Sequence, residues 1–258
     1  MMWVVIAWRN IWRNVRRTLV ILAAVVVGVW SMVSLGALMR GVADRIVENG
    51  IATLTGHIQI HAPGYREDPS VENSMDNPGE VEEVLRSVLP PGSLWTVRVR
   101  VPAVVSNARN SRGITLVGVV PGREEKVSFL GVAVKEGEFL RPGDPNGAVA
   151  GGDLVKLFGT KVGRKLVVTA QDANGDIASR AFRIRGIFRA DMAATEREFL
   201  FVPLDSARKL LKMGEKVSEF AVLLPDHSAA REVAERIRRR LPEGKYEVSP
   251  WQDLLPLT

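Results

Sequence analysis

The chain has 258 residues and no cysteine, which excludes disulfide frameworks, thiolate metal sites and thiol catalysis. With 46% hydrophobic and 25% charged residues it has the composition of a folded protein. The formal net charge is +6, but the four arginines before Arg40 supply +4 of it. From Arg40 onward 31 basic residues balance 29 acidic ones, so the body offers little attraction to nucleic acid, and we expect no nucleic-acid partner.

The first predicted element is an apolar helix over residues 18–39, which contain no charge and no proline. A helix of that length is roughly 33 Å long, enough to cross a hydrocarbon core of about 30 Å. A core helix of a soluble protein would show a polar stripe, which this stretch lacks. A signal peptide has a shorter apolar region, of about 7–15 residues, followed by a cleavage site. The pattern therefore favours a permanent transmembrane helix, with a cleaved signal peptide as the main alternative.

Residues 1–17 combine aromatic and basic side chains in the pattern of a membrane interface. Tryptophan favours the headgroup layer, and arginines beside a span stay on the cytoplasmic side. We therefore predict a cytoplasmic interfacial helix over residues 1–17 of a protein in the inner (plasma) membrane, with the main domain periplasmic or extracellular. The residues that set this interface and orientation are Trp3, Trp8, Trp12, Arg9, Arg13, Arg16 and Arg17.

Two β-α-β patterns follow, one near each end of the remaining chain. The first reads "GHIQIHA", then a helix with an apolar stripe from Val81 to Leu89, then "LWTVRVRVPAVV". The second reads "SEFAVLLPD", "SAAREVAERIRRRL" and "KYEVSPW". We expect the two units to pack as one subdomain built from residues 40–120 and 215–258.

The middle of the chain, residues 121–214, has short strands, short helices and many glycine and proline turns. Its clearest signal is a hairpin around Asn174-Gly175. We expect a smaller, β-rich α+β subdomain inserted between the two halves. The predicted fold class is therefore α+β: one N-terminal transmembrane helix followed by an extracytoplasmic domain.

No catalytic, cofactor or metal site is predicted. The chain contains neither a phosphate-binding G-x-x-x-x-G-K-[ST] loop nor a dinucleotide-binding G-x-G-x-x-G turn. His57 and His61 lie on one face of a strand roughly 13 Å apart, too far to share a metal ion, and we interpret them as part of a solvated polar face.

Two further motifs have simple structural readings. The stretch from Asp172 begins like a calcium loop but has Ile177 where the loop needs glycine and Arg183 where it needs glutamate, so a plain turn is favoured. The basic run over residues 236–240 is interpreted as a solvated helix end.

Taken in order, several segments resemble MacB-type ABC transporter permeases, which belong to the FtsX-like permease superfamily. These are "AWRNIWRNVRRT" before the span, "GHIQIHAPGY" after it, then "GGDLVKLFGTKVGRKL", "FRIRGIF", "FLFVPLDSARKLL" and "SPWQDLLP". The resemblance covers nearly the whole chain, and "GHIQIHAPGY" is most similar to the lipoprotein-releasing, Lol-type branch.

The resemblance implies a non-catalytic permease subunit of the mechanotransmission type. Its expected partners are a cytoplasmic ABC ATPase on a separate chain, a second permease copy or a paralogue, the lipid bilayer, and a lipoprotein or other amphiphilic cargo. Neither the cargo nor the direction of transport follows from it.

The resemblance also leaves alternatives open. Permeases of this family have four spans, whereas this sequence stops at Thr258, before the position of the second span. It therefore reads either as a piece of a longer permease or as a naturally short protein. Other interpretations are an FtsX-like regulator of a cell-wall hydrolase and a membrane-anchored binding domain without any ATPase.

Overall fold

A computed structural model describes residues 14–50 and 54–254 of the chain. The chain divides into two units, one reaching Asn49 and the other running from Gly50 to Pro256. Each unit is described by itself below, and the second is called the domain.

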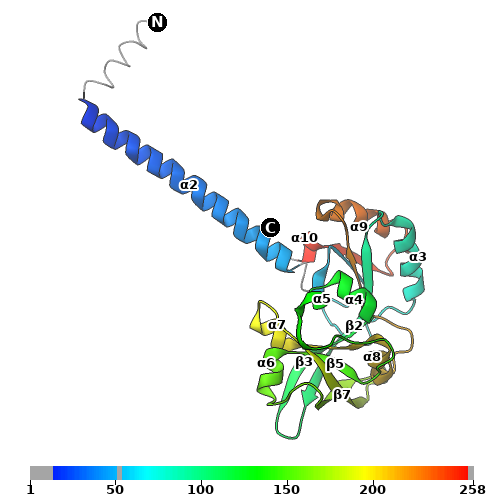
Figure 1. The fold of residues 1–258 in the computed structure, drawn as a ribbon. Helices are drawn as coiled ribbons and strands as arrows, with labels where there is room; N and C mark the ends of the chain where they lie inside the picture. Colours follow the sequence, from blue (N-terminus) through cyan, green and yellow to red (C-terminus); the bar gives the residue numbers. More distant parts are fainter. Residues whose placement is uncertain (1–13, 51–53, 255–258) are drawn as a thin grey trace. The chain divides into compact units, whose positions relative to one another are not determined.

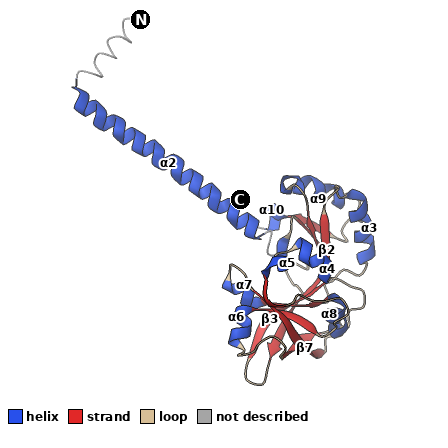
Figure 2. Cartoon of the chain, in the orientation of Figure 1, coloured by secondary structure: helices blue, strands red, loops and turns tan. Residues whose placement is uncertain are grey.

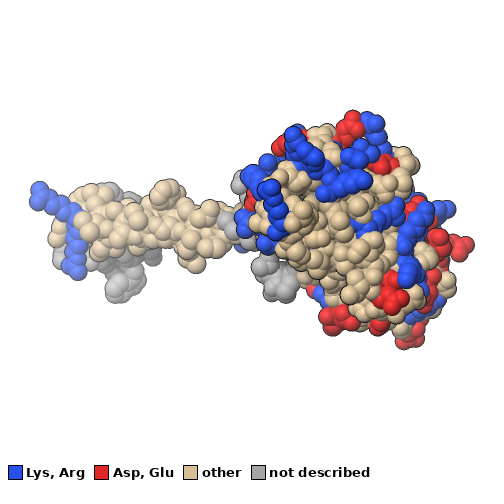
Figure 3. Space-filling view, turned by 90° about the horizontal axis from the view of Figure 1, so that it is seen from below, with Lys and Arg blue, Asp and Glu red and all other residues tan. Residues whose placement is uncertain are grey.

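The first unit is dominated by one long helix, α2 (Val15–Gly50) (Figure 1). Its stretch Val15–Gly41 has a mean hydropathy of 2.4 and is long and apolar enough to cross a membrane. In Figure 3 this helix is free of charge over most of its length, and Trp30 and Met32 are among its exposed side chains. The predicted span over residues 18–39 lies inside this stretch.

The ends of α2 differ from the sequence expectation. The helix continues through Gly50, so residues 40–50 are helical and are not part of the sheet subdomain expected from residue 40. At the other end, residues 15–17 continue into the membrane stretch as one helix, so they do not form a separate interfacial element. Most of the predicted interfacial helix, residues 1–13, falls outside the described residues.

The domain contains strands and helices throughout, which confirms the α+β class (Figure 2). Its strands in chain order are β1 (Ile58–His61), β2 (Leu94–Ser106), β3 (Ser111–Val119), β4 (Val134–Gly137), β5 (Gly147–Gly151), β6 (Lys165–Gln171), β7 (Ile177–Phe188), β8 (Phe199–Pro203), β9 (Glu219–Leu223) and β10 (Glu247–Pro250). Its helices are α3 (Pro78–Val88), α4 (Pro121–Val127), α5 (Leu130–Ala133), α6 (Gly152–Leu157), α7 (Ala193–Glu198), α8 (Leu204–Leu211), η3 (His227–Ala229), α9 (Ala230–Arg238) and α10 (Trp251–Leu254).

The two β-α-β units interleave into one antiparallel sheet with the strand order β10-β1-β9-β2. Each crossover leaves room for a strand of the other unit, which is the split β-α-β arrangement. Helices α3 and α9 lie side by side on one face of this sheet (Figure 1). Their apolar stripes, including Val81, Leu85, Val233 and Ile237, pack on the inward side chains of β1, β2 and β9.

The rest of the domain is a β-barrel built on the second half of β2. Strand β2 pairs with β3, β3 with β8, β8 with β5, β5 with β7, β7 with β6, and β6 again with β2. This ring of pairings has no free edge, which removes the exposed strand that an open sheet would present. Strand β4 adds to the far end of β7.

Strand β2 therefore belongs to both parts of the domain. Its first residues, 94–98, pair with β9 in the sheet, and residues 104–106 pair with β6 in the barrel. Strand β3, which precedes the expected boundary at residue 120, already pairs with β8 from the middle segment. The subdomain boundaries at residues 120 and 214 remain predictions, because the domain is one compact unit.

One contact that joins a helix to the barrel can be tested directly. A Cβ added at Gly118 on β3 would lie 2.5 Å from the Cβ of Ala207 on α8, closer than real side chains approach. We expect Gly118→Ala to lower the free energy of unfolding by about 2 kcal/mol, because the packed helix must move. Urea unfolding of the full chain in detergent measures this.

The matched control is Gly113→Ala on the same strand, where an added Cβ meets nothing within 4 Å. This change should alter stability by less than about 0.5 kcal/mol. Equal effects of the two substitutions would show that α8 does not pack closely on β3.

Candidate functional site

The residues predicted to set the membrane orientation are only partly described. Arg16 and Arg17 lie in the first turn of α2, next to the apolar stretch. Trp3, Trp8, Arg9, Trp12 and Arg13 lie outside the described residues. The structure therefore shows a basic N-terminal end of the helix, and the interface role of all seven residues remains a prediction.

Both connections of the domain leave the same end of the sheet. Ile58, the first residue of β1, pairs with Pro250, the last residue of β10. The amide of Trp251 donates to the carbonyl of His57 at 2.9 Å, and the amide of His57 donates to Val222 at 2.8 Å. The stretch that arrives from α2, called the linker here and described over residues 54–57, is thus hydrogen-bonded beside the start of α10.

The sheet face opposite α3 and α9 is polar but buried. His57, just before β1, and Gln59 and His61 on β1 alternate along the chain and are only 9%, 7% and 2% exposed. The solvated polar face predicted for His57 and His61 is therefore wrong. Leu54 of the linker, Tyr65 of the following loop and Glu124 of α4 all contact side chains of this face, so it is covered.

Three charged or titratable side chains form a row across this face, and we call it the polar row. His61 on β1 pairs in register with Glu219 on β9, which pairs in register with Arg98 on β2. Arg98 and Glu219 are each 1% exposed. The guanidinium Nη1 lies 2.9 Å from Glu219 Oε1, and His61 Nε2 lies 3.7 Å from Glu219 Oε2.

Arg98 is the centre of this arrangement. Its Nε and Nη2 donate to the carboxylate of Glu124, which is fully buried on α4, at 2.8–3.1 Å. Its Nη1 also donates to the backbone carbonyl of Leu54 in the linker at 2.5 Å. One guanidinium thus holds two carboxylates and the chain that arrives from α2.

The charges nearly balance. Two carboxylates face the single charge of Arg98, and Arg100 at 4.0 Å from Glu219 supplies further positive charge. Burial alone would raise the pKa of Glu219, but the hydrogen bond from His61 and the charges of Arg98 and Arg100 hold it far below its usual range. Burial likewise tends to lower the pKa of Arg98, and its two carboxylate partners raise it instead. Glu219 and Arg98 are therefore both charged at neutral pH.

His57 makes a second fastening of the linker. Its Nδ1 accepts the amide of Leu224 at 2.9 Å, and its ring lies 6.1 Å from that of His227. The ring of His227 in turn lies 6.4 Å from the indole of Trp251, the first residue of α10. Burial and the neighbouring His227 lower the pKa of His57. A neutral His57 is needed here, because protonation of Nδ1 would remove the acceptor for Leu224.

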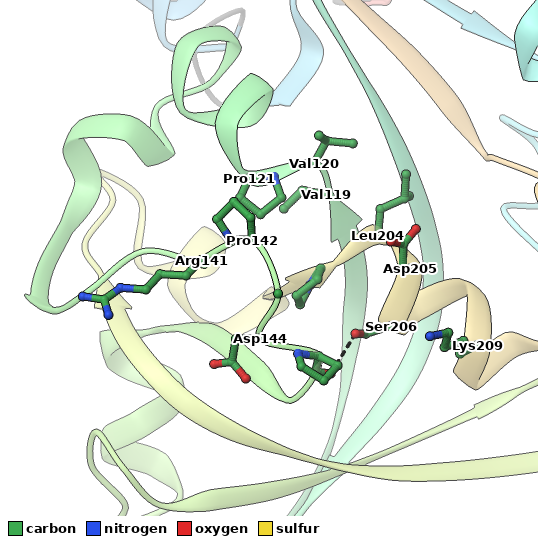
Figure 4. A pocket seen from close by; sticks show the side chains of 13 residues that line it. Val119, Val120, Pro121, Arg141, Pro142, Asp144, Leu204, Asp205, Ser206 and Lys209 are labelled. Carbon is green, nitrogen blue, oxygen red and sulfur yellow. Dashed lines mark hydrogen bonds between the residues drawn. The ribbon is translucent and has the colours of Figure 1, made fainter.

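Two cavities lie in the domain near these elements. One of about 360 Å³ borders the polar row and is lined by Gln59, His61, Tyr65, Arg100 and Glu219 among others. The other, of about 400 Å³, lies between the end of β3, the start of α8 and the turn at Pro142 (Figure 4).

The cavity in Figure 4 is lined by residues that hold neighbouring segments of the domain together. Its Ser206 hydroxyl donates to the carbonyl of Pro145, and the carboxylate of Asp144 pairs with Arg185 at 2.6 Å. The described residues contain no group of three side chains placed to hold a metal ion.

The key residues of the row could not be singled out by motif. Arg98 and Glu124 are 26 positions apart, and Arg98 and Glu219 are 121 apart. One signal was present: Thr96, Arg98 and Arg100 alternate with valines in β2, which places polar side chains on one face of a strand. That pattern also fits an exposed face, so it did not reveal the burial.

Comparison with known proteins identifies the family of this chain. Residues 18–240 match the family described as the MacB-like periplasmic core domain. Two curated relatives are named lipoprotein-releasing system transmembrane protein LolC. The one from Xylella fastidiosa is 29% identical over 141 residues, covering 52% of this chain and 33% of the relative. The one from Neisseria meningitidis is 23% identical over 216 residues, covering 81% of this chain and 49% of the relative. The chain thus spans half or less of the length of these relatives.

Solved structures share the fold. The periplasmic region of MacB from Actinobacillus actinomycetemcomitans aligns with a TM-score of 0.54 at 15% identity, covering 81% of this chain and 95% of that one. The extracellular domain of the noncanonic ABC-type transporter YknZ from Gram-positive bacteria aligns with a TM-score of 0.51 at 14% identity, covering 74% of this chain and 98% of that one. At these identities the likeness shows the fold alone.

Removing Arg98 should be costly. Arg98→Met leaves two buried carboxylates without their main partner, and we expect the free energy of unfolding to fall by about 3–5 kcal/mol. Arg86→Met is the control, because its side chain is 68% exposed in an ion pair with Glu82 and should cost no more than about 1 kcal/mol. Urea unfolding of the full chain in detergent compares the two.

The same variant should change the response to acid. The low pKa of Glu219 contributes stability that is fully present above its ordinary value of 4.5 and is lost as the pH falls below it. Without Arg98 one of the lowering charges is gone, so unfolding free energies measured from about pH 6 to pH 3 should fall less steeply than in the unsubstituted chain. An unchanged slope would contradict the assigned charge pairing.

Replacement of His57 should affect a different pH window. Because its folded pKa is lowered, the stability that neutral His57 contributes is present above its ordinary value of 6.5 and is lost on acidification. His57→Asn keeps a side-chain oxygen near the Leu224 amide and cannot titrate. We expect stability measured between about pH 7 and pH 5 to become flatter, and the same slope in both proteins would argue against a buried neutral histidine.

Proposed function

Because this chain belongs to the MacB-like periplasmic core domain family, we propose that it supplies the first span and extracytoplasmic domain of an ABC-transporter permease of the mechanotransmission type. The observation that carries the proposal is the fastening of both domain connections at one end of the sheet. Motion of membrane helices on either side of the domain would reach the sheet at this point.

The proposed orientation places the N-terminus in the cytoplasm. Arg16 and Arg17 stand immediately before the apolar stretch, and basic residues next to a span are retained on the cytoplasmic side. The domain that follows α2 is then periplasmic, or extracellular in a cell with one membrane. The names of the solved relatives, which are periplasmic and extracellular domains, support this orientation.

The energy source is proposed to be a separate cytoplasmic ABC ATPase. The sequence contains no G-x-x-x-x-G-K-[ST] loop, so it offers no phosphate-binding site of that kind. The permease unit is proposed to be a dimer, formed with a second copy or a paralogue. The subunit itself is then non-catalytic: it converts motion on one side of the membrane into motion on the other.

The proposed cargo is a lipoprotein or another amphiphile. The support is the printed name of the two relatives, which are components of lipoprotein-releasing systems. The identity levels of 29% and 23% leave the cargo of this chain as a proposal. The competing function, a membrane-anchored regulator or binding domain without an ATPase, makes no use of the fastened connections.

Co-purification tests the proposal. The protein is tagged at Met1 in its own cell, extracted in mild detergent and analysed by mass spectrometry, with the intact mass of the bait measured in the same run. We expect an ATPase with phosphate-binding loop motifs in stoichiometric amount, and a bait heavier than the 28.3 kDa of these 258 residues.

The control bait carries Arg98→Met and Glu124→Gln, which should retain the ATPase because the polar row lies in the domain and not at a cytoplasmic surface. A bait of 28.3 kDa that brings no ATPase would reject the permease function. It would favour an anchored domain instead.

A further inference from the structure

We propose that Arg98 is a positioning residue that locks the linker to the sheet and to α4, so that a displacement of α2 moves the domain and does not merely stretch the linker. The locking follows from the described contacts alone. Its role in transport rests on the proposed function.

The contact lies close to the membrane helix along the chain. Leu54 is four residues beyond Gly50, the last residue of α2, so no more than about 14 Å of extended chain separates them. The backbone carbonyl of Leu54 accepts from Arg98, and its side chain is buried with Val117 and Val119 of β3. Leu54 is therefore held both by its backbone and by its side chain.

Arginine suits this task because its donors are fixed in one plane. Nε and Nη2 are engaged by Glu124 on α4, and Nη1 is shared between Glu219 on β9 and the carbonyl of Leu54. Two carboxylates therefore prevent the guanidinium from rotating away from the linker. Lysine has a single ammonium group and cannot keep all three partners in these directions.

The row is poorly explained by stability alone. Taking an ion pair out of water costs about as much as its attraction returns, and apolar side chains of similar size often serve equally well. A buried guanidinium with a backbone partner does specify a position, because every one of its bonds has a direction. We therefore attribute the row to placement of the linker.

Loss of Arg98 should lengthen the free part of the linker. The next described backbone bond of the linker is that of the His57 amide to Val222. Without Arg98, Leu54 keeps only its side-chain packing, and where this gives way the first fixed point moves from residue 54 to residue 57, which releases three residues, or roughly 10 Å of chain. A pull on α2 would then be absorbed before it reached the sheet.

The test uses a variant that removes the lock without leaving an unpaired charge. Arg98→Met with Glu124→Gln removes one positive and one negative group, and Glu219 keeps His61 and Arg100 as neighbours. The amide introduced at position 124 can still accept from the hydroxyl of Thr96, which donates to Glu124 at 3.2 Å in the unsubstituted chain. The matched control is Glu124→Gln alone, in which Arg98 keeps Glu219 and Leu54.

The readout is the distance between two spin labels in the full chain, reconstituted in lipid nanodiscs. The chain has no cysteine, so Arg40→Cys on α2 and Glu232→Cys on α9, both exposed, are the only labelled sites. We expect the same width of the distance distribution in the unsubstituted chain and in the control. In the double variant it should broaden by on the order of 10 Å while the domain stays folded.

Equal widths in all three proteins would overturn the proposal. If the double variant does not fold, Arg98→Lys takes its place, since it retains the positive charge and loses the planar donors. A width unchanged by Arg98→Lys then counts against the lock.

The label distances need no ATPase, so they separate the two hypotheses. Broadening in a protein that co-purifies with no ATPase would leave the lock standing and reject the transport function. Recovery of an ATPase together with unchanged widths would support the transport function and reject the lock.

Discussion

The arrangement of the domain depends on a charge that has been taken out of water. The guanidinium of Arg98 is buried under the linker and α4, and it can remain there only because Glu124 and Glu219 surround it. With the carbonyl of Leu54 it has three partners, and each comes from a different element: α4, β9 and the linker. A buried arginine that loses any of them is left with unmet donors, so the elements are held in one mutual arrangement.

Strand β2 extends this constraint through the domain. Arg98 lies where β2 passes from its pairing with β9 to its pairing with β3. The same strand continues to Ser106 and closes the barrel through β6. The sheet and the barrel therefore share one continuous strand. That continuity suits a domain proposed to transmit motion.

The elements that sequence reasoning predicted best are those with local causes. The apolar helix α2 follows from an uninterrupted run of uncharged residues, and α3 follows from the apolar stripe that begins at Val81. The hairpin at Gly175 forms with a positive φ of 81°, which glycine tolerates. The barrel was not predicted, because its closure depends on β6 meeting β2, a strand far away in the chain. Periodicity within a strand carries no information about its neighbour.

By itself, the sequence determined the membrane helix, the two β-α-β units and the absence of thiol chemistry, since each depends on residues close together in the chain or on composition. Tertiary structure alone decided that the polar face of β1 is buried and that Arg98 meets Glu219 and the carbonyl of Leu54. The physical reason is that alternation along a strand shows which side chains share a face. Whether water or another element covers that face depends on strands and loops that approach from distant parts of the chain.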